Sequence, residues 1–261
     1  MTNKSSGVPQ HYGLMNIHAG AMFTHDDLMR LRTINEPWPS ESTAPRFFLG
    51  RTIDGAAIWR FRYDVSILVE KLEQLCADEP VITDIHTRPK HCEAYMDLLQ
   101  SDHYTMGPCY YVPPVSMPAL QTISITKDNI TDWDYSGFKW LLSEIEYAQP
   151  CVGIAVDNKL VSICRSVRIC LQAHEAGLET LEAFRGKGYA SEAVVGWAQA
   201  VRKMNAAPLY RRSVTISPHS GSQQNANCLC MESISRSNKP NRLHCNMQKS
   251  TRFGAFLLCS H

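Results

Sequence analysis

The spacing of apolar residues in the first part of the chain predicts a mixture of helices and strands. Residues 65–79 place apolar side chains at helical intervals, and Pro80 ends the pattern. Two strand-like runs flank the turn pair formed by Asp54 and Gly55, which predicts a hairpin. A helix is predicted to begin at Thr24, which can cap it, and the Asp27 side chain could accept the backbone N–H of Thr24 in return. Similar patterns predict a helix over 89–102 and an extended segment over 104–114.

The next part of the chain predicts a second set of elements, which we treat as a separate unit over residues 119–210. Asp157 and Asn158 form a turn pair between two strand-like runs. A strand over 176–181 is followed by a short loop and by a helix over 188–205, and upstream of these we expect a strand over 120–126 and a helix over 132–150. The apolar stripe of the 188–205 helix consists of Ala190, Val194, Trp197, Val201 and Met204.

The stretch FRGKGYA, from Phe184, lies between that predicted strand and the start of the 188–205 helix. The first backbone N–H groups of a helix have no intrahelical acceptor and carry partial positive charge, so they bind phosphate readily. Gly186 and Gly188 would let a phosphate approach the backbone and would permit positive φ. Arg185 and Lys187 add positive charge. The stretch therefore predicts a pyrophosphate-binding loop.

Nucleotide-binding motifs narrow the choice of ligand. The Walker spacing is absent, and the dinucleotide fingerprint fails because Ser191 stands where its third glycine belongs. The pattern Arg-x-x-Gly-x-Ala is present in Arg185, Gly188 and Ala190. In its strand–loop–helix setting it resembles the acyl-CoA loop of the GNAT superfamily of N-acetyltransferases, and at fold level the resemblance covers residues 122–210. A solvated tight turn and a generic nucleotide-binding loop are the alternative interpretations.

The GNAT resemblance implies a fold, an activity and a set of binding residues. The fold is α/β (α+β), with a mixed, mostly antiparallel sheet flanked by helices and preceded by a smaller α/β domain over residues 1–118. The activity is transfer of an acetyl group from acetyl-CoA to the amine of a small molecule or a peptide, without a metal. The strand before the loop would contact the pantetheine arm through its main chain, and the loop would bind the pyrophosphate. The residues so assigned are Leu178, Glu179, Thr180, Arg185, Gly186, Lys187, Gly188, Tyr189, Ala190 and Ser191.

The resemblance also suggests where a general base would lie. Some members of the superfamily have a glutamate near the start of the strand that precedes the loop, and Glu175 fits this position. Glu179 and His174 are further candidates. The alternative interpretation of Glu175 is a solvated carboxylate at the end of a strand. The alternative function is that of a non-catalytic acyl-CoA-binding or sensor protein. No motif indicates the acceptor amine or the oligomeric state.

Composition and charge exclude several classes of partner. Lys plus Arg (26) nearly balance Asp plus Glu (25), so no nucleic acid is indicated as a partner. No apolar run approaches the roughly 18–20 residues that span a bilayer, and the N-terminus lacks the apolar core of a signal peptide. We therefore expect a cytoplasmic protein with no membrane partner. Cysteines scattered among apolar residues predict buried, reduced thiols at Cys76, Cys92, Cys109, Cys151, Cys164 and Cys170.

The last segment, residues 211–261, does not continue the pattern of the superfamily. It is rich in serine, has Glu232 as its only acidic residue and shows no sustained period, so we expect it to be poorly ordered. Allowed codons for residues 210–238 can be read in another frame as a family-like sequence, and we interpret the segment as the product of a frameshift. The acetyltransferase unit would then be incomplete, with an open sheet edge and weak activity. The alternative is a zinc site, although the usual spacings are missing, formed by Cys228, Cys230, His244, Cys245, Cys259 and His261.

Overall fold

The structure is a computed structural model and describes residues 11–39, 41–82, 84, 86–114, 118–212, 214–216, 223–224 and 251–260. Its α-helices are α1 (His11–Met22), α2 (Val69–Ala77), α3 (Cys92–Leu99), α4 (Leu141–Glu144) and α5 (Tyr189–Lys203). Its strands are β1 (Phe23–His25), β2 (Leu31–Ile34), β3 (Phe47–Thr52), β4 (Ala57–Phe61), β5 (His103–Tyr111), β6 (Ile123–Ile125), β7 (Cys151–Val156), β8 (Lys159–Ile169), β9 (Ala173–Thr180), β10 (Ala207–Arg211), β11 (Val214–Ile216), β12 (Gln223–Gln224) and β13 (Thr251–Ser260).

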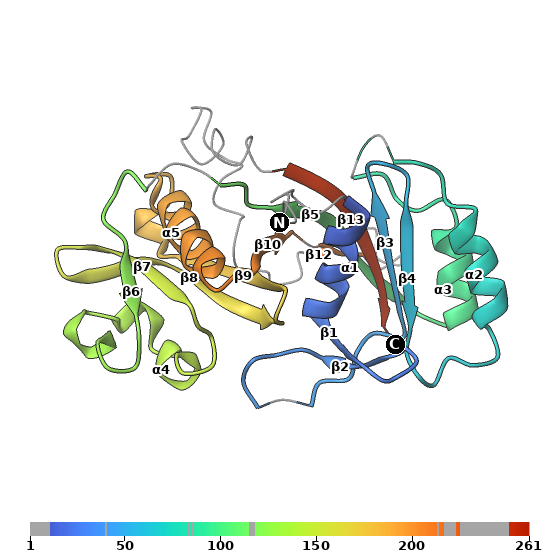
Figure 1. The fold of residues 1–261 in the computed structure, drawn as a ribbon, viewed down its shortest axis with the longest axis horizontal. Helices are drawn as coiled ribbons and strands as arrows, with labels where there is room; N and C mark the ends of the chain where they lie inside the picture. The colour runs from blue at the N-terminus through green and yellow to red at the C-terminus, as the bar shows by residue number, and fades with distance from the viewer. Residues whose placement is uncertain are drawn as a thin grey trace, which may run out of the picture.

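Most of these strands form one sheet in the order β4-β3-β13-β5-β10-β9-β8-β7-β6. The pairing of β9 with β10 is parallel, and the other pairings along this path are antiparallel. In Figure 1, α2 and α3 lie beyond β4 at one end of the sheet, α4 and α5 lie at the other end, and α1 lies between them. The fold is therefore a mixed, mostly antiparallel sheet flanked by helices, as predicted.

The predicted hairpins form where short-range turn chemistry is strong. β3 pairs with β4 around Gly55, whose φ is 89°, and β7 pairs with β8 around Asp157 and Asn158, with φ of 49° and 65°. Glycine, aspartate and asparagine tolerate this left-handed conformation better than other residues, and such turns match the twist of the strands that they join. These local signals are sufficient to fix the hairpins.

The helices predicted at residues 65–79, 89–102 and 188–205 are also confirmed, as α2, α3 and α5. In α5 the predicted stripe is only partly buried. Trp197 and Val201 are fully buried, whereas Met204 lies past the end of the helix and is 54% exposed. No helix in the described part of the chain is long and apolar enough to span a membrane.

The helix predicted from Thr24 is wrong, because this segment forms the β1–β2 hairpin. The Asp26 carboxylate accepts the backbone N–H groups of Leu28 and Arg30, each at 3.0 Å. Such a side-chain turn competes with helical hydrogen bonding. The helix in this region lies earlier, in α1, and the sequence reasoning missed it. Its buried residues lie together on one face: Leu14, Met15, His18, Ala19, Ala21 and Met22. Its opposite face holds glycine, tyrosine, asparagine and isoleucine and no acidic or basic residue, so the charged polar face by which an amphipathic helix is recognised is missing.

The single helix predicted over residues 132–150 is replaced by two 3-10 turns and the short helix α4. The main chain of Asp134 explains the interruption. Its N–H donates to the carbonyl oxygen of Asn158 at 2.8 Å, and its carbonyl oxygen accepts the N–H of Leu160 at 2.9 Å. A residue that pairs with a neighbouring strand in this way cannot supply helical hydrogen bonds at the same time.

β13 lies in the middle of the sheet, which corrects the expectation that residues 211–261 lack regular structure. It is antiparallel to β3 on one side and to β5 on the other. Phe253, Phe256 and Leu257 are almost completely buried, so this apolar run is a central strand rather than an open edge. Residues 217–222 and 225–250, which hold much of the suspected frameshifted segment, lie outside the described residues.

The sheet continues across the boundary predicted between residues 118 and 119. β5 lies before this boundary and pairs with β10 after it, with Leu209 opposite Tyr111 and Arg211 opposite Cys109. One apolar core joins α1 to side chains from β3, β5, β9, β10 and β13. Hydrogen bonding and packing thus connect the two portions of the chain, and their division into two domains stays a prediction.

Gly254 lies where β13 approaches β3 too closely for a side chain. A Cβ atom there would be 2.3 Å from the carbonyl oxygen of Arg51 and 2.5 Å from Cε of Met15. We expect Gly254→Ala to lower the free energy of unfolding by about 1–3 kcal/mol in urea titrations, because backbone would have to move. The control is Gly20→Ala in α1, where a Cβ meets nothing within 4 Å. This substitution should raise the free energy of unfolding by about 0.5–1 kcal/mol. Unchanged stability of Gly254→Ala would contradict the central position of β13.

Candidate functional site

The glycine loop connects β9 to α5 through a short 3-10 turn, Glu182–Phe184, in the predicted order of strand, loop and helix. Gly186 and Gly188 have φ of 76° and 88°, a conformation that residues with a Cβ rarely adopt. A Cβ atom built on either glycine would meet nothing within 4 Å. The glycines are therefore required by the backbone conformation, and the described residues leave the space beside them open.

Successive backbone N–H groups at the start of α5 are free of acceptors among the described residues. The N–H groups of Ser191 and Glu192 donate to the carbonyl oxygen of Gly188, at 3.1 and 3.3 Å. No such acceptor is found in the described part of the chain for Lys187, Gly188, Tyr189 and Ala190. Donors at a helix N-terminus, aided by the helix dipole, form a site for an anion.

The charges around the loop have the sign that an anion requires. Arg185 is exposed, and its Nε donates to the carbonyl oxygen of Thr180 at 3.2 Å, which leaves its terminal nitrogens for other acceptors. The Lys187 ammonium lies 4.9 Å from the centre of the Phe184 ring. In the described residues, neither cation is within 4 Å of a carboxylate. The nearby acid Glu192 faces elsewhere, since its Oε2 accepts the N–H of Ala119 at 2.6 Å.

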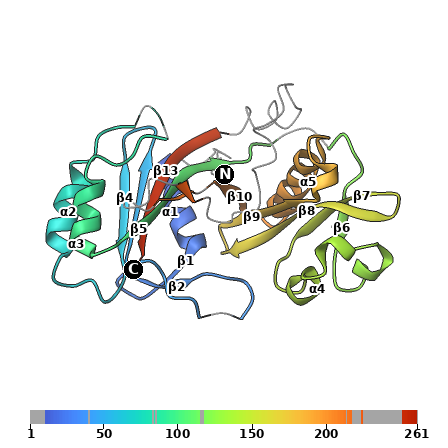
Figure 2. The ribbon, with the colours of Figure 1, turned by 180° about the vertical axis from the view of Figure 1, so that it is seen from behind.

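β9 and β10 begin side by side and then separate. Their parallel pairing runs from Ala173 opposite Ala207 to Glu175 opposite Leu209. Beyond this point β5 is the only described strand that pairs with β10, and β9 continues alongside β8 as far as Thr180. No described strand pairs with the β10-facing edge of β9 beyond Glu175. The two neighbouring strands can be followed near the middle of the sheet in Figure 2.

The predicted pantetheine contacts lie on this separated part of β9. Leu178 is buried against α5, in the same apolar cluster as Trp197. The hydroxyl groups of Thr180 and Ser162 are hydrogen-bonded at 2.8 Å. Glu179 is half-buried, and burial raises the pKa of its carboxyl group against the opposing effects of Arg165 and Arg185. The structure thus brings the three strand residues and the loop residues to one end of β9.

Glu175, the predicted base, lies in a different environment from Glu179. Its side chain is 4% exposed, with Oε2 2.8 Å from Nε2 of His18 and Oε1 2.9 Å from Nε of Arg211. Burial acts to raise the pKa of Glu175, but Arg211, His18 and Arg168 outweigh it and hold the pKa well below the usual range. A carboxylate so stabilised in its ionised form is a weak proton acceptor.

His174, the other candidate, belongs to a buried hydrogen-bonded group beneath α5. Trp197 donates its indole N–H to the Ser166 hydroxyl at 3.1 Å, and this hydroxyl lies 2.9 Å from Nδ1 of His174. Burial lowers the pKa of His174, which keeps the ring neutral at physiological pH. These contacts are those of a core histidine that links β8, β9 and α5.

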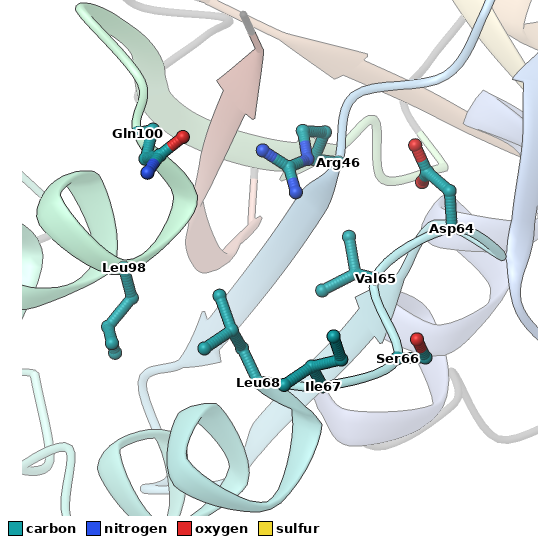
Figure 3. Close-up of a pocket in the computed structure, with 8 residues that line it drawn as sticks. All are labelled: Arg46, Asp64, Val65, Ser66, Ile67, Leu68, Leu98 and Gln100. Carbon is teal, nitrogen blue, oxygen red and sulfur yellow. The ribbon is translucent and has the colours of Figure 1, made fainter.

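A cavity of about 290 Å³ lies in the first portion of the chain, and sequence reasoning missed it (Figure 3). It is formed by Arg46 before β3, the segment between β4 and α2, and the end of α3. Its lining combines apolar and polar side chains: Arg46, Asp64, Val65, Ser66, Ile67, Leu68, Leu98 and Gln100. No motif could have indicated this cavity, because its residues meet only when these elements pack, and none of them belongs to the glycine loop.

The six cysteines predicted to be reduced are free, and all except the half-buried Cys170 are buried. Of the residues in the zinc interpretation, only Cys259 is described. Its thiol is buried beside the Met96 sulfur, and burial raises its pKa. The described ranges hold no group of three or more histidine, cysteine or acidic side chains suited to a metal ion.

Glu175 should give the stability of the protein a defined pH dependence. The pKa of Glu175 is lower in the folded than in the unfolded chain. Its contribution to stability is therefore complete when the pH lies above the ordinary glutamate pKa, about 4.3, and is lost as the pH falls toward the pKa in the folded chain. We expect Glu175→Gln to lower the free energy of unfolding by roughly 3 kcal/mol near neutral pH, because Arg211 loses its buried partner.

Urea unfolding of wild type and Glu175→Gln, followed from neutral pH down to about pH 4, measures this effect, and the difference should narrow as the pH falls. The control is Glu146→Gln, which removes an exposed carboxylate paired with Lys127 and should change stability by less than about 1 kcal/mol. A Glu175→Gln difference that stays constant with pH would contradict the low pKa.

No family model and no curated protein matches the chain. A GNAT-family protein from Novosphingobium aromaticivorans is similar in structure at 13% identity and a TM-score of 0.38, over 61% of this chain and 66% of that chain. A GNAT-family acetyltransferase from Colwellia psychrerythraea has 11% identity and a TM-score of 0.39, over 86% of this chain and 84% of that chain. A GCN5-related N-acetyltransferase-like protein from Streptococcus suis has 10% identity and a TM-score of 0.39, over 83% and 84%.

Proposed function

We propose that this protein is an acetyl-CoA-dependent N-acetyltransferase of the GNAT type. The observation that carries the proposal is the run of backbone N–H groups over residues 187–190, at the start of α5, that have no acceptor in the described part of the chain. Two glycines with positive φ expose these groups, and Arg185 and Lys187 flank them without carboxylate partners in the described residues. The pyrophosphate of coenzyme A supplies the negative charge and the acceptor oxygens that such an arrangement binds.

The separated edge of β9 supplies a place for the rest of the ligand. The pantetheine arm is a chain of amide groups, so it can exchange hydrogen bonds with a strand that has lost its neighbour. The edge of β9 beyond Glu175 leads directly to the loop. An acetyl-CoA molecule with its pyrophosphate on α5 would therefore place its pantetheine along residues 177–180.

The reaction needs few protein groups beyond those that hold the two substrates. The amine nitrogen attacks the carbonyl carbon of the thioester, the C–S bond of the resulting tetrahedral species breaks, and the amine loses a proton as the thiolate leaves. Positioning supplies much of the rate in such a reaction. Glu179, with its raised pKa, is better suited than Glu175 to accept the proton, and the acceptor amine is of a small molecule or a peptide.

One observation favours the alternative of a non-catalytic acyl-CoA-binding protein. Both oxygens of Glu175 are held by Arg211 and His18, so the residue at the family's base position is already occupied. A protein of this kind would bind acetyl-CoA but release no thiol with any amine. Thiol release measured across a panel of amines separates the two functions.

Acetyl-CoA binding by calorimetry tests the proposal. We expect Arg185→Ala and Lys187→Ala each to weaken binding roughly tenfold, because a charge-assisted contact to phosphate is worth about 1.5–3 kcal/mol. Lys203→Ala, at the opposite end of α5, is the matched control and should bind like wild type. No binding by wild type at millimolar acetyl-CoA would contradict the proposal, as would equal affinities for Lys187→Ala and Lys203→Ala.

A further inference from the structure

Glu175, Arg211 and His18 form a buried group that joins three elements of the fold, and we refer to these three residues as the clasp. Glu175 lies on β9, Arg211 at the end of β10 and His18 in α1. The side-chain exposures of Glu175 and His18 are 4% and 0%. The carboxylate accepts from both neighbours, at 2.9 Å from Nε of Arg211 and 2.8 Å from Nε2 of His18. A buried carboxylate requires such partners, so the clasp constrains all three elements.

The clasp lies at the point where β9 and β10 separate. Glu175 is the last residue of β9 that pairs with β10, opposite Leu209. Arg211 follows two residues later on β10, where the main chain is paired with Cys109 of β5 on its other edge. The ion pair therefore crosses the opening between the two strands just beyond their last backbone pairing. It limits how far the strands can part and where the parting begins.

α1 and β13 hold the clasp from the other side. The His18 ring meets the Phe253 ring edge-on, with centroids 6.0 Å apart, and the Arg211 guanidinium lies 5.2 Å from the centre of the Phe256 ring. Because Glu175 accepts from Nε2 of His18, this nitrogen carries the hydrogen, and Nδ1 has no partner in the described residues. The ring therefore acts in this group as a single hydrogen-bond donor.

We propose that Glu175 is a positioning residue, which with Arg211 and His18 sets the opening between β9 and β10 where the pantetheine arm enters. The inference rests on the proposed acetyl-CoA function for its ligand. It gives Glu175 a role different from that of a general base. It also makes α1, which lies far from the loop in sequence, part of the acyl-CoA groove.

The experiment compares wild type with His18→Leu and His18→Gln. Leucine removes the donor, whereas the amide nitrogen of glutamine can replace Nε2. The first measurement is backbone hydrogen exchange of the free protein, and the second is acetyl-CoA binding by calorimetry. We expect His18→Leu to speed exchange at residues 176–180 at least tenfold and to raise Kd about tenfold, with exchange in α2 and α3 unchanged. His18→Gln should restore most of the protection from exchange and most of the acetyl-CoA affinity.

Two results would overturn the role of the clasp. One is wild-type exchange and affinity in His18→Leu, and the other is faster exchange that extends equally through α2 and α3, which would show a general loss of stability. If His18→Leu does not fold, His18→Asn, which is too short to reach Glu175, is judged by the same criteria. Failure of wild type to bind acetyl-CoA would instead reject the proposed function, and the exchange of the free protein would still decide whether the clasp holds β9.

Discussion

The buried carboxylate of Glu175 is the constraint on which the arrangement of the site depends. A charge removed from water must be met by partners of opposite sign or by hydrogen-bond donors, and here these come from β10 and from α1. The three elements must therefore be in place together. They meet where β9 and β10 stop pairing. The contacts of Glu175 with Arg211 and His18 therefore determine where these two strands separate.

The opening and the glycine loop belong to one continuous stretch of chain. β9 leaves its neighbour after Glu175, runs alongside β8 to Thr180, and reaches the start of α5 after one short turn. Among the described residues, the edge of β9 beyond Glu175 has no strand neighbour and the N–H groups of residues 187–190 have no acceptor, so the stretch offers hydrogen bonds to an amide chain at one end and to a pyrophosphate at the other. This combination accounts for the proposed ligand better than either feature would alone.

The parts of the fold that sequence predicted are those fixed by neighbours along the chain. Gly55, Asp157 and Asn158 form their turns through their own backbone preferences, and Gly186 and Gly188 mark the loop for the same reason. The strand–loop–helix order that suggested an anion site was readable because each element carries its own periodicity.

The parts that could not be predicted depend on contacts between distant segments. His18 and Glu175 are 157 positions apart, so no local pattern could reveal that the candidate base is held by α1. In the sequence, β13 is only a short apolar run, and its central position follows from its pairing with β3 and β5. The residues around the 290 Å³ cavity are likewise brought together only by packing. The helix predicted from Thr24 does not form because the hydrogen bonds of the Asp26 side chain stabilise a turn there instead.

Backbone amide NMR of the protein with and without coenzyme A tests the central claim most directly. If the N–H groups of residues 187–190 bind the pyrophosphate, their proton resonances should move downfield on addition of the ligand, with smaller changes along residues 177–180. Coenzyme A binding that leaves residues 187–190 unchanged and shifts amides elsewhere would contradict the account.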